Sequence, residues 1–206
     1  MHHHNPAIRS RCLVGKPWRC ISGYGHAPEH IALYQADAGV LISGDMVLPR
    51  ISTNVSVYDA EPEADNLRLF LESIDKFKLL PAGTLTLPSH GKPFVGLHER
   101  IAQLHAHHRD RLGEVMQACA EKACCAHDVL PVLFKRPLDL HQTTFAMGEA
   151  IAHIHALWHA GQLQRQGGAD GLEAALQGLP QGQEQRLAFA ICAGFERIRQ
   201  AMPRIF

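Results

Sequence analysis

The chain has little that would direct it to a charged partner or to a membrane. Its 20 Lys and Arg residues balance its 20 Asp and Glu residues, so no net charge draws it to nucleic acid or to a lipid surface. No uninterrupted apolar run approaches the roughly 20 residues of a membrane-spanning helix, and the opening "MHHHNPAIRSRC" lacks the apolar core of a signal peptide. With 46% hydrophobic residues among 206, we expect a folded, cytoplasmic protein of one or two domains.

The six cysteines show neither CxxC pairing nor the spacing of a disulfide framework. Reduced thiols in a cytoplasm are the simplest interpretation, and we expect Cys119, Cys124 and Cys125 to be buried or incidental thiols rather than zinc ligands. Histidine is the unusually frequent residue, with 15 copies. Frequency alone is weak support for a metal site, and the run "MHHHN" supplies no candidate ligand.

The residue patterns predict strands alternating with helices. β-Forming residues between turn residues predict strands at 17–24, 30–35, 40–45 and 84–87. Apolar residues at helical spacing predict one helix over 62–78 and a long one from 97 to about 123. The buried stripe of the long helix should contain Leu97, Ile101, Leu104, Val115 and Cys119. Residues 49–61 are polar and irregular, which is typical of a loop over a site.

A second unit begins near "AHDVLPVLF". The run "FAMGEAIAHIHALWHAG" predicts a helix that ends at Gly161, and "QLQRQ" predicts a strand after it. One face of this helix should hold Met147, Ile151, Ile154 and Trp158. Short helices, a longer helix and a strand predict a winged-helix-like unit. We therefore expect three segments, the last a linker and a helix near 183–200 with no assigned role: 1–125, 126–168 and 169–206.

Three loops each place a metal-ligating side chain at the end of a predicted strand. They carry His26 in "GYGHAPEH", Asp45 in "LISGDMVLP" and His90 in "LTLPSHGKP". Imidazole and carboxylate are ordinary ligands of zinc and related divalent ions. Taken singly, each residue could belong to a surface loop or a turn. Because strand ends converge in layered α/β folds, the three together favour a metal site.

The segments "GHAPEH", "SGDMVLP" and "PSHGKP", in this order and with these gaps, resemble the later metal motifs of the metallo-β-lactamase-fold hydrolases. The unit after the long helix is similar to the winged-helix domain of one branch of that superfamily, which includes β-lactamase-like protein 2 and glyoxalase II-like relatives. The resemblance covers about residues 17–167. It implies an α/β fold in which this chain forms the C-terminal half of an αββα sandwich, followed by a winged-helix-like domain.

The resemblance also implies a role for each residue. His26 would bind a first zinc ion, His90 a second, and Asp45 would bridge both ions as the catalytic carboxylate. His30 would support the site rather than ligate. Two such ions, roughly 3.5–4 Å apart, would activate a water against an ester, thioester or related bond of a small molecule and would stabilise the oxyanion that forms.

One part of the family pattern does not occur in these 206 residues. The His-x-His-x-Asp-His motif, which supplies most of the remaining ligands, is missing, so each ion would keep two protein ligands instead of the usual three or four. We therefore expect the C-terminal part of a longer enzyme, or the product of a truncated gene, with little or no hydrolysis alone. The inner sheet face of this half-sandwich would favour self-association or binding to a full-length homologue.

The other histidine-rich runs have simpler explanations. His105 and His108 in "HAHHRD" should be solvated or pack between helices, because no third ligand is near. His153, His155 and His159 could include a chelating pair, but a winged-helix surface is the simpler interpretation. Two further functions stay open, a nucleic-acid-binding winged helix and a non-catalytic remnant. The first is disfavoured because "FAMGEAIAHIHALWHAG" contains no Lys or Arg.

Overall fold

The computed structural model describes residues 10–13, 15–167 and 174–175. The chain divides into two compact units, Met1–Val55 with Asn66–His107 and Ser56–Asp65 with His108–Phe206. In the described ranges no helix is long and apolar enough to cross a membrane. The helix expected near 183–200 lies outside the described residues, and the expected domain boundary at residue 125 stays a prediction.

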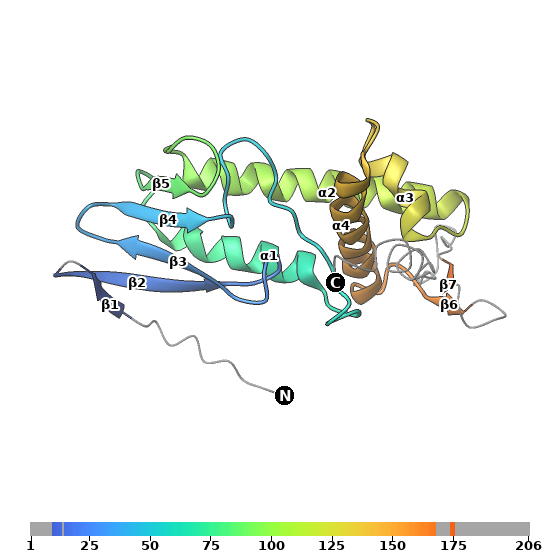
Figure 1. Cartoon of the computed structure of the whole chain (residues 1–206), viewed down its shortest axis with the longest axis horizontal. Helices are drawn as coiled ribbons and strands as arrows, with labels where there is room; N and C mark the ends of the chain where they lie inside the picture. Colours follow the sequence, from blue (N-terminus) through green and yellow to red (C-terminus); the bar gives the residue numbers. More distant parts are fainter. Residues whose placement is uncertain (1–9, 14, 168–173, 176–206) are drawn as a thin grey trace. The chain divides into compact units, whose positions relative to one another are not determined.

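A five-stranded sheet forms the centre of the first unit (Figure 1). In spatial order its strands are β1 (Ser10–Leu13), β2 (Lys16–Gly23), β3 (His30–Gln35), β4 (Val40–Gly44) and β5 (Leu85–Pro88). Neighbouring strands from β1 to β4 are antiparallel, whereas β5 runs parallel to β4. The four expected strands are confirmed to within one or two residues, and β1 is an addition that the sequence patterns did not predict.

Among the described residues, one face of this sheet is buried and the other is partly exposed. Ala32, Leu41 and Thr86 are fully buried, while Ile31, Ile42 and Leu85 on the alternate positions are 44%, 39% and 38% exposed. Figure 1 shows α1 (Asn66–Asp75) and the start of α2 (Leu97–Glu121) running alongside the strands. The apolar stripes of these helices are buried and complete the core: Leu67, Phe70, Ile74, Leu97, Ile101 and Leu104.

The helix expected over 62–78 begins four residues later than the prediction. Residues 61–64 form a turn in which the Ala64 amide donates to the Glu61 carbonyl at 3.1 Å. Pro62 is the second residue of this turn, a position that its fixed φ angle favours, so it does not start the helix. α1 then runs over Asn66–Asp75, and a short 3₁₀ helix, η1 (Lys76–Leu79), follows it.

The second unit is mainly helical. After the end of α2 come α3 (Ala126–Leu133), α4 (Leu140–His159) and a small antiparallel pair, β6 (Gln166–Gly167) with β7 (Ala174–Ala175). α4 begins five residues earlier than expected because Asp139 forms a capping box with Gln142, whose amide donates to the Asp139 carboxylate at 2.8 Å. Val115 and Cys119, expected in the buried stripe of α2, are fully buried.

The end of α4 explains why the expected strand at 162–166 is nearly absent. Gly161 ends the helix with a φ of 70°, as the sequence predicts. The Gln162 amide still donates to the Leu157 carbonyl at 2.9 Å, and Leu163 donates to the same oxygen. These two amides therefore cap the C-terminal end of α4 and are not available for a strand, so strand pairing starts only at Gln166.

Two histidines of α4 that we expected on a surface are fully buried, so that prediction is wrong. Their Nδ1 atoms donate to backbone carbonyls, His153 to Glu149 at 2.8 Å and His155 to Ala64 at 3.0 Å. His108 Nδ1 lies 3.2 Å from His153 Nε2, which confirms the helix-packing role expected for His108. A hydrogen bond at one ring nitrogen lowers the cost of burying an imidazole, and the spacing of residues along α4 does not reveal that Ala64 and His108 lie beside these rings.

Candidate metal centre

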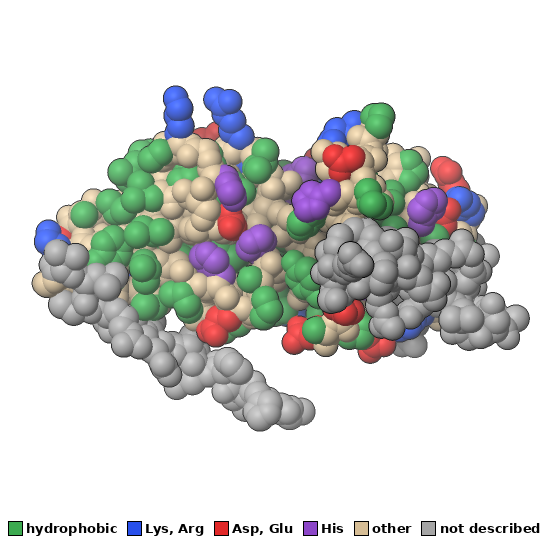
Figure 2. Space-filling model, viewed as in Figure 1, with side chains coloured by type: hydrophobic (Ala, Val, Ile, Leu, Met, Phe, Trp, Pro, Cys, Tyr) green, Lys and Arg blue, Asp and Glu red, His purple; other side chains and the backbone are tan. Residues whose placement is uncertain are grey.

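The sheet topology brings the three predicted ligands to one edge. β2, β4 and β5 all run in the same direction, opposite to β3, so their carboxyl ends meet at the same side of the sheet. His26 follows β2, Asp45 follows β4 directly and His90 follows β5. Figure 2 shows histidine side chains gathered around an acidic one on this part of the surface.

The Asp45 carboxylate lies between the two imidazoles. Its Oδ2 atom is 3.7 Å from His26 Nε2, and its Oδ1 atom is 3.5 Å from His90 Nε2. Two donor atoms bound to one tetrahedral zinc ion at ordinary bond lengths are about 3.4 Å apart. Asp45 Oδ2 and His26 Nε2 are therefore about as far apart as two ligand atoms of one ion, and so are Asp45 Oδ1 and His90 Nε2.

The tautomer of His26 supports the same interpretation. Its Nδ1 atom is 2.8 Å from the carbonyl oxygen of Asn54, and a carbonyl can only accept, so Nδ1 carries the proton. In the neutral ring Nε2 then presents a lone pair toward the Asp45 oxygen. Two electron-rich atoms facing each other across 3.7 Å are stabilised by a cation between them, or by protonation of the ring.

His30 lies beside these residues without an equivalent contact to Asp45. It is the first residue of β3, and its ring packs so closely against Gly44 that a Cβ at that glycine would overlap it. Burial lowers the pKa of His30, and His26 lowers it further, while Asp45 acts in the opposite direction. A neutral His30 packed behind the site agrees with the supporting role expected for it, which stays a prediction.

The described residues fit two metal ions only in part. In the ranges that the structure covers, no group of three or more His, Cys, Asp or Glu side chains is arranged to hold one ion. Asp45 Oδ1 is buried without a hydrogen-bond donor among these residues, as a ligand atom would be. One bridging carboxylate and one imidazole per ion is the donor set present, below the usual three or four protein ligands.

Sequence reasoning missed the residues that hold the loop between β4 and α1. Arg100, in the first turn of α2, donates from Nε to the Leu48 carbonyl at 2.7 Å and from Nη2 to the Ile51 carbonyl at 2.8 Å. The Thr53 hydroxyl donates to the Asp45 carbonyl. The accepting atoms are backbone oxygens, so no side-chain motif marks them in the sequence.

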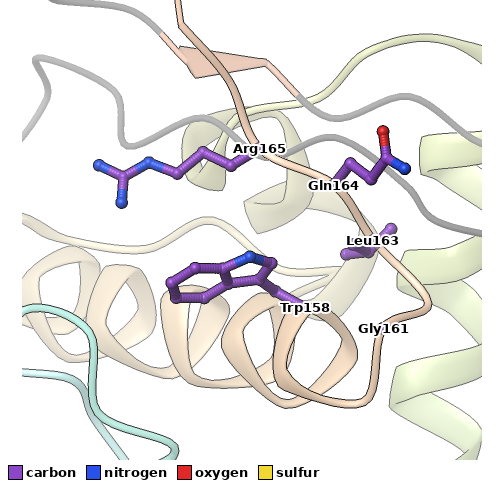
Figure 3. A pocket seen from close by; sticks show the side chains of 5 residues that line it. All are labelled: Trp158, Gly161, Leu163, Gln164 and Arg165. Carbon is purple, nitrogen blue, oxygen red and sulfur yellow. The ribbon is translucent and has the colours of Figure 1, made fainter.

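The second unit contains a pocket of about 510 Å³ at the end of α4. It is lined by Trp158, Gly161, Leu163, Gln164 and Arg165, and Figure 3 shows the Arg165 side chain lying over the indole ring. The guanidinium carbon is 6.0 Å from the ring centre, and the same guanidinium pairs with Glu63 at 2.9 Å. None of these five described lining residues carries a carboxylate, imidazole or thiol that could act as nucleophile or metal ligand.

Comparisons with known proteins agree with this arrangement. The family model described as "Metallo-beta-lactamase-like, C-terminal domain" matches residues 112–174. A β-lactamase domain protein from Burkholderia ambifaria matches 87% of this chain with a TM-score of 0.81 and 52% identity, over 52% of its own length. The chain belongs to the metallo-β-lactamase-fold family.

Two further relatives of this family extend the comparison. A metallo-β-lactamase family protein from Thermus thermophilus matches 84% of the chain with a TM-score of 0.71 and 29% identity, over 52% of its own length. The probable metallo-hydrolase YqjP of Bacillus subtilis is 26% identical over 145 residues, which is 68% of this chain and 44% of YqjP. The chain thus spans about half the length of the metallo-β-lactamase-fold relatives that it matches.

Proposed function

We propose that this chain holds one side of a dinuclear zinc site in a metal-dependent hydrolase of the metallo-β-lactamase superfamily. His26 and His90 would each bind one ion, and Asp45 would bind both. The observation that carries the proposal is the Asp45 carboxylate, whose two oxygens face different imidazole nitrogens at 3.7 and 3.5 Å. A turn-forming aspartate beside two surface histidines would not need this double alignment.

The expected substrate is a small molecule with an ester, thioester or related bond. When bound, two zinc ions supply a Lewis acid for the reacting oxygen and lower the pKa of water. Asp45 would hold both ions through its two carboxylate oxygens, and the Asn54 carbonyl orients His26 through its Nδ1 proton. His90 is 70% exposed and holds the open side of the site, where a substrate can approach. With two side chains per ion, we expect little or no turnover from this chain alone.

Zinc titration calorimetry tests the ligand assignment directly. We expect the purified chain to bind zinc, and Asp45→Asn to weaken binding by about 100-fold or more, because both ions lose a charged ligand. His26→Ala should weaken one binding event only. The matched control is His127→Ala, which removes an exposed histidine of α3 and should leave the isotherm unchanged. Equal affinities for the wild type and Asp45→Asn would refute the assignment.

We further propose that the open sheet face mediates self-association or binding to a longer homologue. Three large aliphatic side chains on neighbouring strands support this proposal, since Ile31, Ile42 and Leu85 are each more than a third exposed. In sedimentation velocity, Ile42→Glu should shift the chain toward monomer. Leu79→Glu, at the end of η1, removes a still more exposed side chain that belongs to no strand and should change nothing. A wild-type chain that sediments as a monomer would contradict self-association.

For the second unit we propose a winged-helix-like module that packs or frames substrate. The order of α3, α4 and a short β pair supports this assignment. Nucleic-acid binding is not favoured, because α4 contains no Lys or Arg, and salt-dependent retention on DNA or RNA would reverse that judgement. A cytoplasmic location is supported by the free thiols among the described residues: Cys20, Cys119, Cys124 and Cys125.

A further inference from the structure

We infer that Arg100 is a positioning residue of the metal site and acts by holding residues 45–54, hereafter the ligand loop. The inference rests on the proposed function, since it assigns Arg100 a role toward the same ions. The ligand loop begins at Asp45 and ends at Asn54, whose carbonyl orients His26. Control of this one loop therefore acts on two of the three proposed ligands.

Arg100 forms two hydrogen bonds to the middle of the ligand loop. Its Nε and Nη2 atoms donate to the Leu48 and Ile51 carbonyls at 2.7 and 2.8 Å. Its third nitrogen, Nη1, donates to the Gln103 side chain at 3.2 Å, which fixes the plane of the guanidinium. Hydrogen bonds from a charged donor are short and about twice as strong as neutral ones, and the rigid fork sets the distance between the two carbonyls.

The rest of the ligand loop depends on side chains in the same way. The loop contains no helix or strand, so its carbonyls have no regular backbone ladder to join. The Thr53 hydroxyl ties the two ends together by donating to the Asp45 carbonyl, and the Ser43 hydroxyl donates to the Val47 carbonyl at 3.0 Å. Arg100 supplies the link between this loop and α2, and without it the segment between Val47 and Thr53 loses its two central bonds.

Lysine cannot replace arginine in this role. An ammonium group keeps the positive charge but is a single point, whereas the guanidinium holds two separate carbonyls in a fixed plane. Arg100→Lys should therefore preserve the fold of the sheet and helices while releasing the ligand loop. Arg100→Lys therefore tests the positioning of the ligand loop separately from a general effect on stability. Arg100→Gln alone would not, because it also removes the positive charge.

Hydrogen exchange of the zinc-free chain, followed by zinc calorimetry, tests the inference. In Arg100→Lys we expect amides of residues 46–54 to exchange about 10-fold faster, with β2–β4 amides unchanged, because the loop loses charge-assisted bonds. The zinc dissociation constant should rise about 10–100-fold, as for other groups that orient ligands. The control is Arg68→Lys, whose arginine lies on α1 and pairs with Glu72, and it should change neither measurement.

The outcomes distinguish this inference from the proposed function. Unchanged loop exchange in Arg100→Lys would overturn the inference, and so would faster exchange with unchanged zinc affinity. If the wild-type chain binds no zinc while loop exchange is faster in Arg100→Lys, the proposed function fails and the role of Arg100 in holding the loop stands. Faster exchange together with weaker zinc binding supports both.

Discussion

Replacing Gly25 by alanine should force the loop that carries His26 away from helix α1. Gly25 has a φ of 93°, in the region that favours glycine. A Cβ built there would lie 2.6 Å from the backbone nitrogen of Phe70 and 2.7 Å from its Cβ. Neither atom can swing aside, because the first belongs to the backbone of α1 and the second to a fully buried side chain.

The expected loss of stability has two parts. Placing an alanine in the left-handed region costs about 1–2 kcal/mol, and overpacking of a rigid contact costs about 1–3 kcal/mol more. The free energy of unfolding should therefore fall by about 2–5 kcal/mol in Gly25→Ala. Gly39 is the matched control, since its φ is 62° but a Cβ there would meet nothing within 4 Å. Gly39→Ala should show only the first part.

Urea denaturation followed by circular dichroism measures both variants against the wild type. The difference between them isolates the contact of the His26 loop with α1, because the backbone cost is common to both. Equal losses of stability for Gly25→Ala and Gly39→Ala would refute the reasoning, since the close approach of this loop to the helix would then contribute nothing.

Three other substitutions test separate features. Asp139→Ala removes the N-cap of α4 and should lower the unfolding free energy of the second unit by about 1 kcal/mol in the same urea assay. Burial lowers the pKa of His155, so the unfolded chain binds more protons below about pH 6.5, and stability should fall on acidification. His155→Gln should flatten this slope in thermal melts taken across that range, and equal slopes would contradict it. Ile51→Ala keeps the carbonyl that Arg100 binds, so exchange of the ligand loop should stay at the wild-type rate.

Most of the first unit could be predicted because its signals are local. Runs of β-forming residues between turn residues predict β3 and β4. Residue type does not mark the buried face of these strands, since Ser43 is buried and Ile42 is exposed. The parallel β5 follows the helical segment that the crossover requires. Helix ends were harder. Pro62 is equally compatible with a first helical turn and with a β-turn, and only the hydrogen bond from Ala64 to Glu61 decides between them.

The buried histidines show a different limit of the sequence. His153 and His155 are polar residues beside an apolar stripe, so a surface position was the reasonable expectation. A distant partner lies beside each ring: Ala64, which precedes His155 by 91 residues, accepts from its Nδ1, and His153 Nε2 faces His108, 45 residues earlier. A pattern of residue types within one helix carries no information on such distant partners.

In the candidate metal site, too, the ligands could be predicted from the sequence but the atoms that orient them could not. Residue type determines what a side chain can ligate, so His26, Asp45 and His90 are visible in the sequence. The atoms that orient and hold them are carbonyl oxygens, which every residue has. Arg100 binds the carbonyl of Leu48, which lies 52 residues earlier in the sequence, and the residue type at position 48 does not predict that contact. A substitution at a donor such as Arg100, whose side chain binds backbone carbonyls, should therefore disturb the metal site although it changes no ligand. A substitution at a loop residue whose carbonyl accepts should disturb the site less, because the carbonyl remains.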